Sequence, residues 1–573
     1  MLKITEIRMD YEKEQIGITH APEFSWTLES DKRNVIQESY ELEIAEDAAF
    51  DKKIYESGKV KGYASAQIQP DNVKLESQKK YFARVKVTAA GEETDWAETS
   101  FVTGIMDNKE WKAVFVSAEE ETDRDNSKGT YVRGEFTVAK PVKEAFVSVT
   151  ALGLYNFYLN GKKVGNDQLT PGWTSYRKHL CFQTYEVTDY LKEGKNAAGA
   201  ILAAGWYKGK MGFDGLAKRR NHYGENTALL AQMVIRYEDG TEEIVVTDES
   251  WNGADAPVVF AEIYDGEIYD AAKEIKDWAE ADCKDGQWKP ARKLDYDFSV
   301  LTGQGSGKVS LMDEVKPREI FRTPAGDTVI DFGQNMSALI QVTAAGKKGD
   351  VIQLDCFEVL DSKGNVYLDN LRGAKESLQY TFGEEGTITY RPSFTFMGFR
   401  YAKIVSFPGE PSLDNFTANA IHTNMERTGF LETSNQDLNQ LAHNILWGLK
   451  SNFVDVPTDC PQRDERLGWT GDAEIFCRTA CFLENTYSFY RKWLRDVEAD
   501  QTAEGGVAHV VPDIISGNEG DNWLLEQGSH SAAAWADVAV INPWTMYLTF
   551  GDKEILKIQY NSMKNWINFM REY

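Results

Sequence analysis

The sequence predicts a multidomain protein of the β + α class, in which N-terminal β-sandwich domains precede a helical region. The chain has 573 residues, many more than one hydrophobic core accommodates, so several domains are expected. Up to about residue 420 apolar and polar residues alternate, as in half-buried strands. After about residue 425 the apolar residues recur with the period of a helix.

The first β domain is expected over residues 1–107. Within it, residues 40–44 and 81–87 alternate between apolar and charged side chains, which indicates strands with one buried face. Trp26 and Trp96 are expected to fill the core. The pattern resembles a fibronectin type III-like sandwich.

Two more β domains are expected, over residues 108–305 and 306–424. In the first of these, Asn160-Gly161 between two strand-like runs predicts a two-residue hairpin. Trp173 and Trp206 are open to two interpretations, sugar stacking or packing. In the domain after it, separate strands are expected at residues 329–332, 338–342, 351–354 and 399–405.

The run GQGSGK at residues 303–308 does not qualify as a phosphate-binding P-loop. That motif needs a glycine where Thr302 stands, and it needs a serine or threonine where Val309 follows the lysine.

Helices are expected over residues 425–573. Ser434 followed by Asp437 predicts an N-terminal cap, and an apolar face follows at Leu438, Leu441, Ile445 and Leu449. The next helix is expected from Gly471 to about Asp500, and another over Ala532 to Phe550. The last helix carries an apolar series at Leu556, Tyr560, Met563, Ile567 and Met570.

Composition excludes several classes of function. With 63 basic and 90 acidic residues the net charge is −27, which disfavours nucleic acids and anionic membranes and suits a neutral carbohydrate partner. The six cysteines have no disulfide-framework spacing, and the N-terminus has no apolar signal region, so a cytoplasmic protein is expected. Cys477 and Cys481 lack a second ligand pair, so neither a metal nor a cofactor is expected.

The segment Asp455–Phe476, DVPTDCPQRDERLGWTGDAEIF, is the candidate site. Its prolines and glycines disfavour regular structure, so its many acids are expected on a loop, where they converge on a ligand. Glycoside hydrolysis needs a carboxylic acid to protonate the leaving oxygen and a second carboxylate to activate water. Neighbouring carboxylates and an apolar wall such as Trp469 help an acid to keep its proton. Glu465, which is flanked by charged residues, is the candidate acid.

This segment resembles the bacterial α-L-rhamnosidases of glycoside hydrolase family 78. The runs DFGQN at 331–335, FMGFRY at 396–401 and GWYKGKMG at 205–212 are similar to the same family and are interpreted as scaffold. The resemblance implies a jelly-roll domain at residues 108–305 and a concanavalin-like β-sandwich at 306–424. It also implies that residues 425–573 are the first helices of an (α/α)6 barrel that is incomplete at the C-terminus.

The resemblance further implies removal of terminal α-L-rhamnose by an inverting mechanism, with Glu465 as the general acid. The implied substrate-binding residues are Asp459, Arg463, Asp464, Trp469, Asp472, Trp535 and Asp537, of which Asp464 is the candidate for a purely structural role. Trp523 and Glu526 belong to a looser match at residues 513–528. The general base is expected beyond the end of the chain, so this chain alone is expected to be inactive. Glu504, Glu519 and Glu526 are nominated as bases without support from a motif.

Three alternatives stay open. The chain is a carbohydrate-binding protein without turnover, another glycosidase or a phosphorylase on the same barrel, or a chain whose helical part does not fold alone. Separately, the acids and arginines of the loop are open to interpretation as a structural salt-bridge network. Rhamnosides are the expected partners, and homo-oligomerisation is left open.

Overall fold

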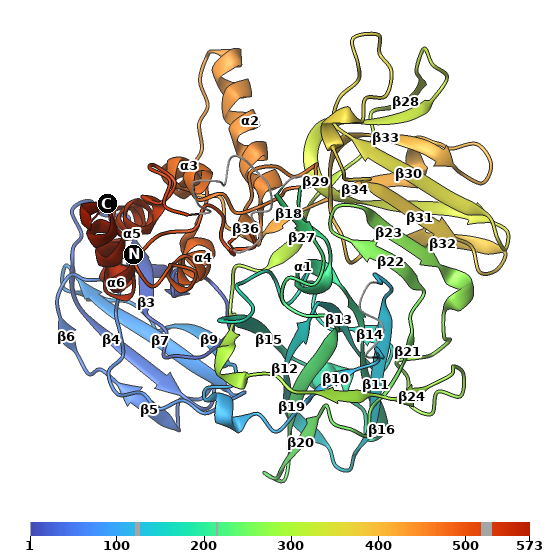
Figure 1. Cartoon of the computed structure of the whole chain (residues 1–573). Coiled ribbons are helices and arrows are strands. Elements are labelled where there is room, and N and C mark those ends of the chain that lie inside the picture. The colour runs from blue at the N-terminus through green and yellow to red at the C-terminus, as the bar shows by residue number, and fades with distance from the viewer. Residues whose placement is uncertain (1, 121–125, 214–215, 517–529, 573) are drawn as a thin grey trace.

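The computed structural model describes residues 2–120, 126–213, 216–516 and 530–572. Three β regions follow one another along the chain, and a helical region follows them (Figure 1). The expected order of β domains before helices is therefore confirmed. The helical region also contacts the first β region, because Tyr11 and Gln67 both donate hydrogen bonds to the Phe550 carbonyl, at 2.8 and 3.1 Å.

The first β region combines a two-stranded sheet, β1-β3, with a seven-stranded sheet that contains the path β2-β9-β7-β4-β5. In β7 every second side chain is buried, as the alternation predicts. Trp26 is buried, but Trp96 is only half-buried, and the Arg84 guanidinium lies over its ring at 4.5 Å. The strands are β1 (Lys3–Met9), β2 (Gln15–Ile18), β3 (Phe24–Glu29), β4 (Gln37–Ala45), β5 (Lys53–Glu56), β6 (Val60–Lys61), β7 (Lys80–Ala89), β8 (Glu92–Glu93) and β9 (Ala97–Thr103).

The second β region has a seven-stranded and a six-stranded sheet. The predicted hairpin joins β13 to β14, and Asn160 and Gly161 both have positive φ, as a type I′ turn requires. Trp173 and Trp206 are buried and stack on each other, so packing is the correct interpretation. The elements are β10 (Phe115–Ser117), β11 (Thr130–Val138), β12 (Val142–Leu152), β13 (Leu154–Leu159), β14 (Lys162–Lys163), β15 (Leu180–Glu186), β16 (Gly194–Ala203), α1 (Gly205–Lys208), β17 (Met211–Phe213), β18 (Leu216–Arg219), β19 (Ala228–Tyr237), β20 (Glu242–Val246), β21 (Asn252–Asp255), β24 (Lys289–Pro290), β25 (Arg292–Leu294) and β26 (Leu301–Gly303).

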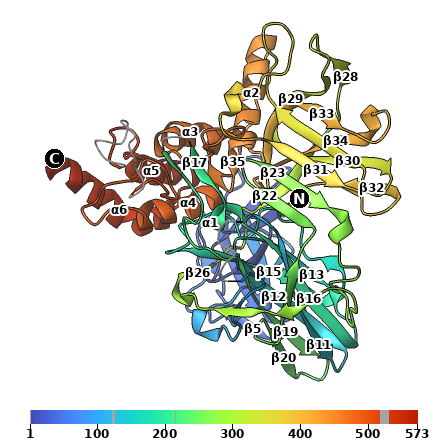
Figure 2. The same ribbon diagram turned by 45° about the vertical axis from the view of Figure 1, so that its right-hand side comes forward.

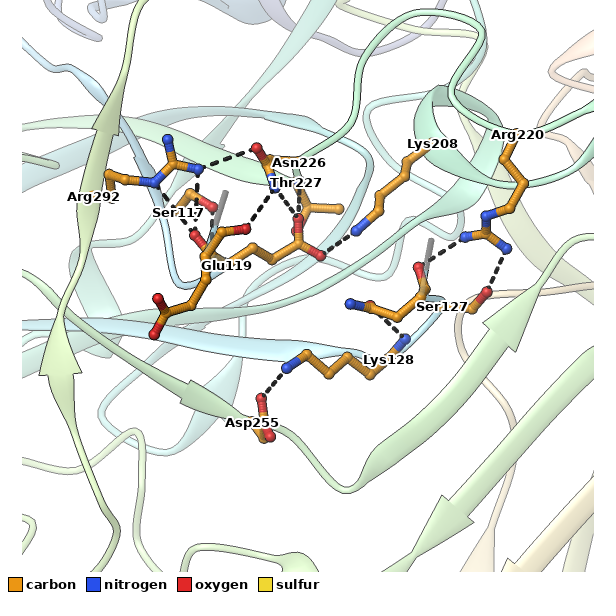
Figure 3. Close-up of polar contacts among 12 residues, drawn as sticks. Ser117, Glu119, Ser127, Lys128, Lys208, Arg220, Asn226, Thr227, Asp255 and Arg292 are labelled. Carbon is orange, nitrogen blue, oxygen red and sulfur yellow. Dashed lines mark hydrogen bonds and ion pairs between the residues drawn. The ribbon is translucent and has the colours of Figure 1, made fainter. Parts of the chain in front are cut away.

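The GWYKGKMG run is fixed by a buried ion pair. Lys208 at the end of α1 donates to Glu119 at 2.6 Å, and both side chains are about 1% exposed (Figure 3). The same carboxylate accepts from the Thr227 backbone N–H at 2.7 Å. Because removal of one partner would leave a buried charge, this run acts as scaffold.

The third β region is a ten-stranded sheet that contains the path β22-β23-β31-β30-β33-β29-β34-β27. Residues 258–270, expected in the domain before it, supply β22 and β23 through parallel pairing of β23 with β31. Residues 328–346 form one strand rather than two, with a register shift between Asp331 and Met336 where Gly333 has a φ of 72°. The strands are β22 (Val258–Glu262), β23 (Gly266–Asp270), β27 (Val309–Val315), β28 (Glu319–Arg322), β29 (Thr328–Gly346), β30 (Val351–Phe357), β31 (Ser377–Thr381), β32 (Gly386–Tyr390), β33 (Met397–Ser406) and β34 (Phe416–Thr423).

The helical region contains α2 (Gln436–Asn452), β35 (Phe453–Val454), β36 (Val456–Pro457), α3 (Thr470–Leu483), α4 (Tyr487–Ala499), α5 (Val538–Phe550) and α6 (Lys553–Glu572). Three predicted boundaries are wrong. Asn435, not Ser434, caps α2. The expected single helix to about Asp500 breaks between α3 and α4, and α5 begins at Val538 rather than at Ala532. Among the described residues, no helix has the length and apolar character needed to cross a membrane.

The predicted helix faces are only partly correct. Leu449 of α2 is buried, whereas Leu438 and Leu441 are 48% and 53% exposed. In α6 the apolar series is largely exposed, and the buried positions are Ile555, Gln559, Ser562 and Trp566. Sequence periodicity identifies the helix, but the neighbouring elements decide which face is covered.

Candidate active site

The loop between β36 and α3 is seated on the third β region through Arg466. This side chain is fully buried, pairs with Glu376, and donates to the Ile263 and Phe396 carbonyls at 2.8 and 2.7 Å. The FMGFRY run therefore contacts the loop directly, as its interpretation as scaffold predicts.

Glu465 lies at the centre of the loop and is 7% exposed. Its Oε1 accepts a hydrogen bond from Trp469 Nε1 at 3.1 Å. Its Oε2 accepts from Arg463 Nε at 3.0 Å and from Arg372 Nη2 at 2.6 Å. Three N–H donors from two regions of the chain thus fix the position of this carboxyl group.

Asp459 stands beside Glu465, with carboxyl oxygens of the two within 4.8 Å of each other. Burial, and after it the charge of Glu465, raises the pKa of Asp459 to about 6. The Leu467 backbone N–H donates to Asp459 Oδ1 at 3.1 Å, and Arg463 Nη2 lies 3.4 Å from Oδ2. Both effects favour the protonated form of Asp459, which therefore keeps its proton at mildly acidic pH.

A cleft of about 600 Å³ opens beside this pair. Polar groups at one end and an apolar wall are typical of a small-molecule site. The Trp535 ring forms part of the wall and lies against Gly471, where an added Cβ would be 2.7 Å from the ring. The lining residues are Ile445, Gly448, Asn452, Phe453, Pro457, Thr458, Asp459, Gly471, Asp472, Ala473, Ile475, Phe476, Ala534 and Trp535.

The structure therefore brings Asp459, Asp472 and Trp535 to the cleft, and it connects Arg463 and Trp469 to Glu465. Asp472 lies in the first turn of α3, and its side chain as a whole is exposed. Desolvation of the carboxyl group by neighbouring atoms, and after it the charge of Glu465, raises the pKa of Asp472.

Two predicted substrate contacts have structural partners instead. Asp464 is buried, and its carboxylate lies 3.1 Å from Arg372 Nε, on the side of the third β region. Asp537 accepts from Trp566 Nε1 at 2.9 Å and from the Ala534 N–H at 3.3 Å, and it does not line the cleft.

The nominated bases gain no support from the described residues. Glu519 and Glu526, like Trp523, lie outside the residues that the structure describes. Glu504 is exposed and does not line the cleft.

Arg372 is the site residue that sequence reasoning missed. It has a φ of 54°, carries no recognisable motif, and reaches Glu465 from the third β region. Its guanidinium also lies 4.9 Å from the Phe213 ring centroid. Only the tertiary fold brings Arg372 to the loop, so no local pattern predicts it.

The loop is a poor metal site. Asp459, Cys460 and Glu465 have ligand atoms within 4.8 Å of one another. Burial raises the pKa of the Cys460 thiol well above its ordinary value, which disfavours the thiolate a metal needs. Two guanidinium groups bind Glu465 and already supply the positive charge.

Glycoside hydrolases use two carboxyl groups beside the site that holds the sugar. Here two neighbouring carboxyl groups lie at the edge of an apolar cleft, and β regions support the helical region that carries them. These features define a protein of the glycoside hydrolase class. Family models agree in every region. They match an N-terminal immunoglobulin domain at residues 4–107, an α-L-rhamnosidase N-terminal domain at 140–313, a concanavalin-like domain at 321–422 and a six-hairpin glycosidase domain at 426–573. The chain belongs to the bacterial α-L-rhamnosidase family.

Individual relatives agree. An α-L-rhamnosidase of Streptomyces avermitilis is 39% identical over 78% of this chain, and one of an Alteromonas species is 34% identical over 96%. The chain spans 42% and 60% of these two proteins. The expected truncation is not confirmed by these comparisons.

Solved structures show the same fold. The α-L-rhamnosidase of Aspergillus terreus is 33% identical, with a TM-score of 0.92. The match covers 99% of this chain and 65% of the Aspergillus chain. A structure of the Streptomyces avermitilis enzyme in complex with L-rhamnose is 28% identical with a TM-score of 0.93, and the chain covers 71% of it.

Proposed function

We propose that this protein is a glycoside hydrolase that removes terminal α-L-rhamnose from rhamnosides, with Glu465 as the general acid. The observation that carries the proposal is the pairing of Glu465 with Asp459 beside the cleft, on a loop buttressed by Arg466. The family match supplies the substrate class. The six-hairpin family model supports the proposal that α2–α6 are helices of an (α/α)6 barrel.

In this mechanism the Glu465 carboxyl group gives the leaving oxygen its proton. Asp459, whose pKa burial and the charge of Glu465 raise to about 6, stays protonated at mildly acidic pH and then adds no negative charge beside Glu465. Arg463 and Arg372 position Glu465 through Oε2, and the Trp469 indole N–H binds Oε1, so a sugar oxygen that reaches Oε1 has to displace this N–H. Asp472 is proposed to accept hydrogen bonds from sugar hydroxyls, and Trp535 to stack on the sugar ring.

Asp459 is not the general base of this reaction. An inverting glycosidase separates its acid and base by about 6.5–9.5 Å so that a water molecule fits behind the sugar. Asp459 and Glu465 are within 4.8 Å, which leaves no room for that water. The inverting course itself rests on the family resemblance, and the base is a carboxylate other than Asp459.

Hydrolysis of p-nitrophenyl α-L-rhamnopyranoside tests the proposal, with L-rhamnose binding followed by calorimetry on the same samples. Glu465→Gln is expected to slow hydrolysis of methyl α-L-rhamnopyranoside, whose alkoxide leaving group needs a proton, far more than hydrolysis of the nitrophenyl glycoside, while L-rhamnose still binds, since the amide keeps a hydrogen-bond acceptor but has no acidic proton. Glu504→Gln, an exposed acid away from the cleft, is the matched control. Equal rates for Glu465→Gln and the unmodified protein would overturn the acid assignment.

A second candidate is carbohydrate binding without turnover. The observation in its favour is that both oxygens of Glu465 accept hydrogen bonds from protein N–H groups. In that case L-rhamnose binds, Asp459→Ala abolishes binding, and no nitrophenol is released at any pH.

A further inference from the structure

A second cavity lies where the first β region, the second β region and α4 meet. None of its lining residues belongs to the loop that carries Asp459 and Glu465. The cavity lining comes from Asp10, from β2 and the residues after it, from β15, from the end of β26 and the loop after it, and from α4. Figure 2 labels β15, β26 and α4. Its volume is about 90 Å³, enough for several water molecules. The lining residues are Asp10, Gln15, Ile18, Thr19, His20, Cys181, Gly303, Gln304, Gly305, Ser306, Tyr487, Ser488, Arg491, Lys492 and Arg495.

Arg495 is the unusual member of this lining. No hydrogen bond or ion pair joins its guanidinium to another described residue, although burial is strong enough to lower the pKa of the group. The acid beside it in the chain, Asp496, is engaged elsewhere, accepting from the Ser175 N–H at 3.2 Å and from the His179 ring at 3.0 Å. Arg495 is half-buried and lines the cavity, so its guanidinium is available there to an anionic ligand.

Arg491 adds a second positive charge on the same side of α4. Residues four apart on a helix are neighbours, so the two guanidinium groups repel each other, and Arg491 contributes to the lowered pKa of Arg495. Arg491 donates to the Tyr487 hydroxyl at 2.5 Å and forms no ion pair among the described residues.

The other charged groups of the lining are already occupied. Lys492 binds the Asp455 carboxylate at 2.7 Å and the Trp173 carbonyl at 3.1 Å. Asp10 lies 3.0 Å from the His20 ring, and its charge, like those of Asp552 and Glu23, also acts on the Arg491 guanidinium. Arg495 is therefore the lining cation with the least compensation.

The third component is the loop Gly303–Ser306, part of the GQGSGK run. Among the described residues, no acceptor pairs with the backbone N–H of Gly305 or of Ser306. A Cβ at Gly305 would lie 2.5 Å from Gln15 Oε1 and 2.8 Å from Ile18 Cγ2, so a larger residue here would have to displace these side chains of the cavity wall. Free N–H groups of a glycine loop are donors for an anion, even where the full P-loop motif is missing.

We propose that this cavity binds a tetrahedral oxyanion, phosphate or sulfate, held by Arg495 and Arg491 and by the backbone of Gly305–Ser306. The anion joins three regions of the chain and offsets the repulsion between the two arginines. Arginine suits this task because its fixed N–H donors match the oxygens of such an anion. The site is separate from the Glu465 loop, so its anion is a structural ligand and not a reactant.

Thermal unfolding in phosphate, sulfate and chloride at matched ionic strength tests the proposal. Phosphate or sulfate is expected to raise Tm in a saturable way, as a ligand of the native state does, and chloride is not. In calorimetry, Arg495→Met is expected to weaken phosphate or sulfate binding by about tenfold or more, the cost of one charged hydrogen-bonding partner. Arg478→Met, which removes an exposed arginine of α3, is expected to leave the affinity unchanged.

Diffraction from crystals soaked in selenate gives an independent test that needs no variant. An anomalous selenium peak between Arg491 and Arg495 supports the proposal, and a soaked crystal without one overturns it. The proposal is also overturned if chloride matches phosphate and sulfate, or if Arg495→Met binds both anions as tightly as the unmodified protein. If Arg495→Met does not fold, Arg491→Met takes its place in the calorimetry.

Discussion

Arg466 and Glu376 form an ion pair in which both side chains are 0% exposed. The arginine belongs to the loop that carries Glu465, whereas the glutamate precedes β31 of the third β region. Glu376 also accepts a hydrogen bond from the Gly398 N–H at 2.8 Å. The position of the candidate acid therefore depends on a β region that contributes little of the cleft itself.

Arg466→Met is expected to lower the free energy of unfolding by about 3–5 kcal/mol, because it leaves the Glu376 charge buried without a partner. Urea unfolding at pH 7 measures this. Arg478→Met is the control, since its side chain is exposed, and it is expected to change the free energy of unfolding by less than about 0.5 kcal/mol. The double variant Arg466→Met/Glu376→Met is expected to be more stable than Arg466→Met alone. A double variant that shows the sum of both single losses would argue against the pair.

Gly398→Ala is expected to reduce activity from outside the cleft. An added Cβ would lie 2.6 Å from the Pro461 backbone carbon and 2.8 Å from the Gln462 nitrogen, so the loop has to shift. Overpacking of this kind costs about 1–3 kcal/mol of stability, and a displaced Glu465 lowers kcat more than it raises KM. Gly386→Ala, which meets no atom within 4 Å, is the control. Unchanged kinetics in Gly398→Ala would show that the loop is not held at this contact.

The sequence predicted local structure well and partnerships poorly. The alternation of β7 and the Asn160-Gly161 turn depend on neighbouring residues only, and both are correct. The exposed apolar series of α6 and the contact of Arg372 with Glu465 depend on which distant elements pack together. The sequence predicts separate strands on the two sides of Gly333. In the structure this glycine allows a bulge within one long strand, residues 328–346.

The candidate site shows the same division. The loop could be located from its composition, and two acids of the segment, Asp459 and Asp472, line the cleft together with Trp535. The partners of individual carboxylates could not be predicted, because Asp464 and Asp537 are bound by Arg372 and Trp566, which lie far from them in the chain.

Trp535→Ala is expected to weaken L-rhamnose binding by about tenfold, equivalent to about 1.4 kcal/mol of lost contact between the ring and the sugar. The ring is 39% exposed and forms one wall of the cleft. Calorimetry with L-rhamnose measures the change. Trp544→Ala is the control. It removes another exposed tryptophan, which packs on Tyr547 in α5 outside the cleft, and it is expected to leave the affinity for L-rhamnose unchanged. Equal losses in the two variants would point to a general effect on the helical region.

Asp459→Asn is expected to stabilise the protein at neutral pH while it lowers activity. The pKa of Asp459 is raised from 3.8 to about 6 in the folded chain. Between these values the folded protein holds a proton that the unfolded chain has lost, so the free energy of unfolding falls as pH rises through this range. Asparagine has no proton to lose, and its amide oxygen still accepts from the Leu467 N–H.

Since one pKa unit corresponds to about 1.4 kcal/mol, the gain at pH 7 is expected to be about 2–3 kcal/mol and to vanish near pH 4. Urea unfolding at pH 4 and pH 7 measures it. Asp295→Asn, at a side chain that is 99% exposed, is expected to change neither value. If Asp459→Asn were no more stable than the unmodified protein at pH 7, the fold would not be raising the pKa of Asp459, and burial beside Glu465 would not disfavour its charge.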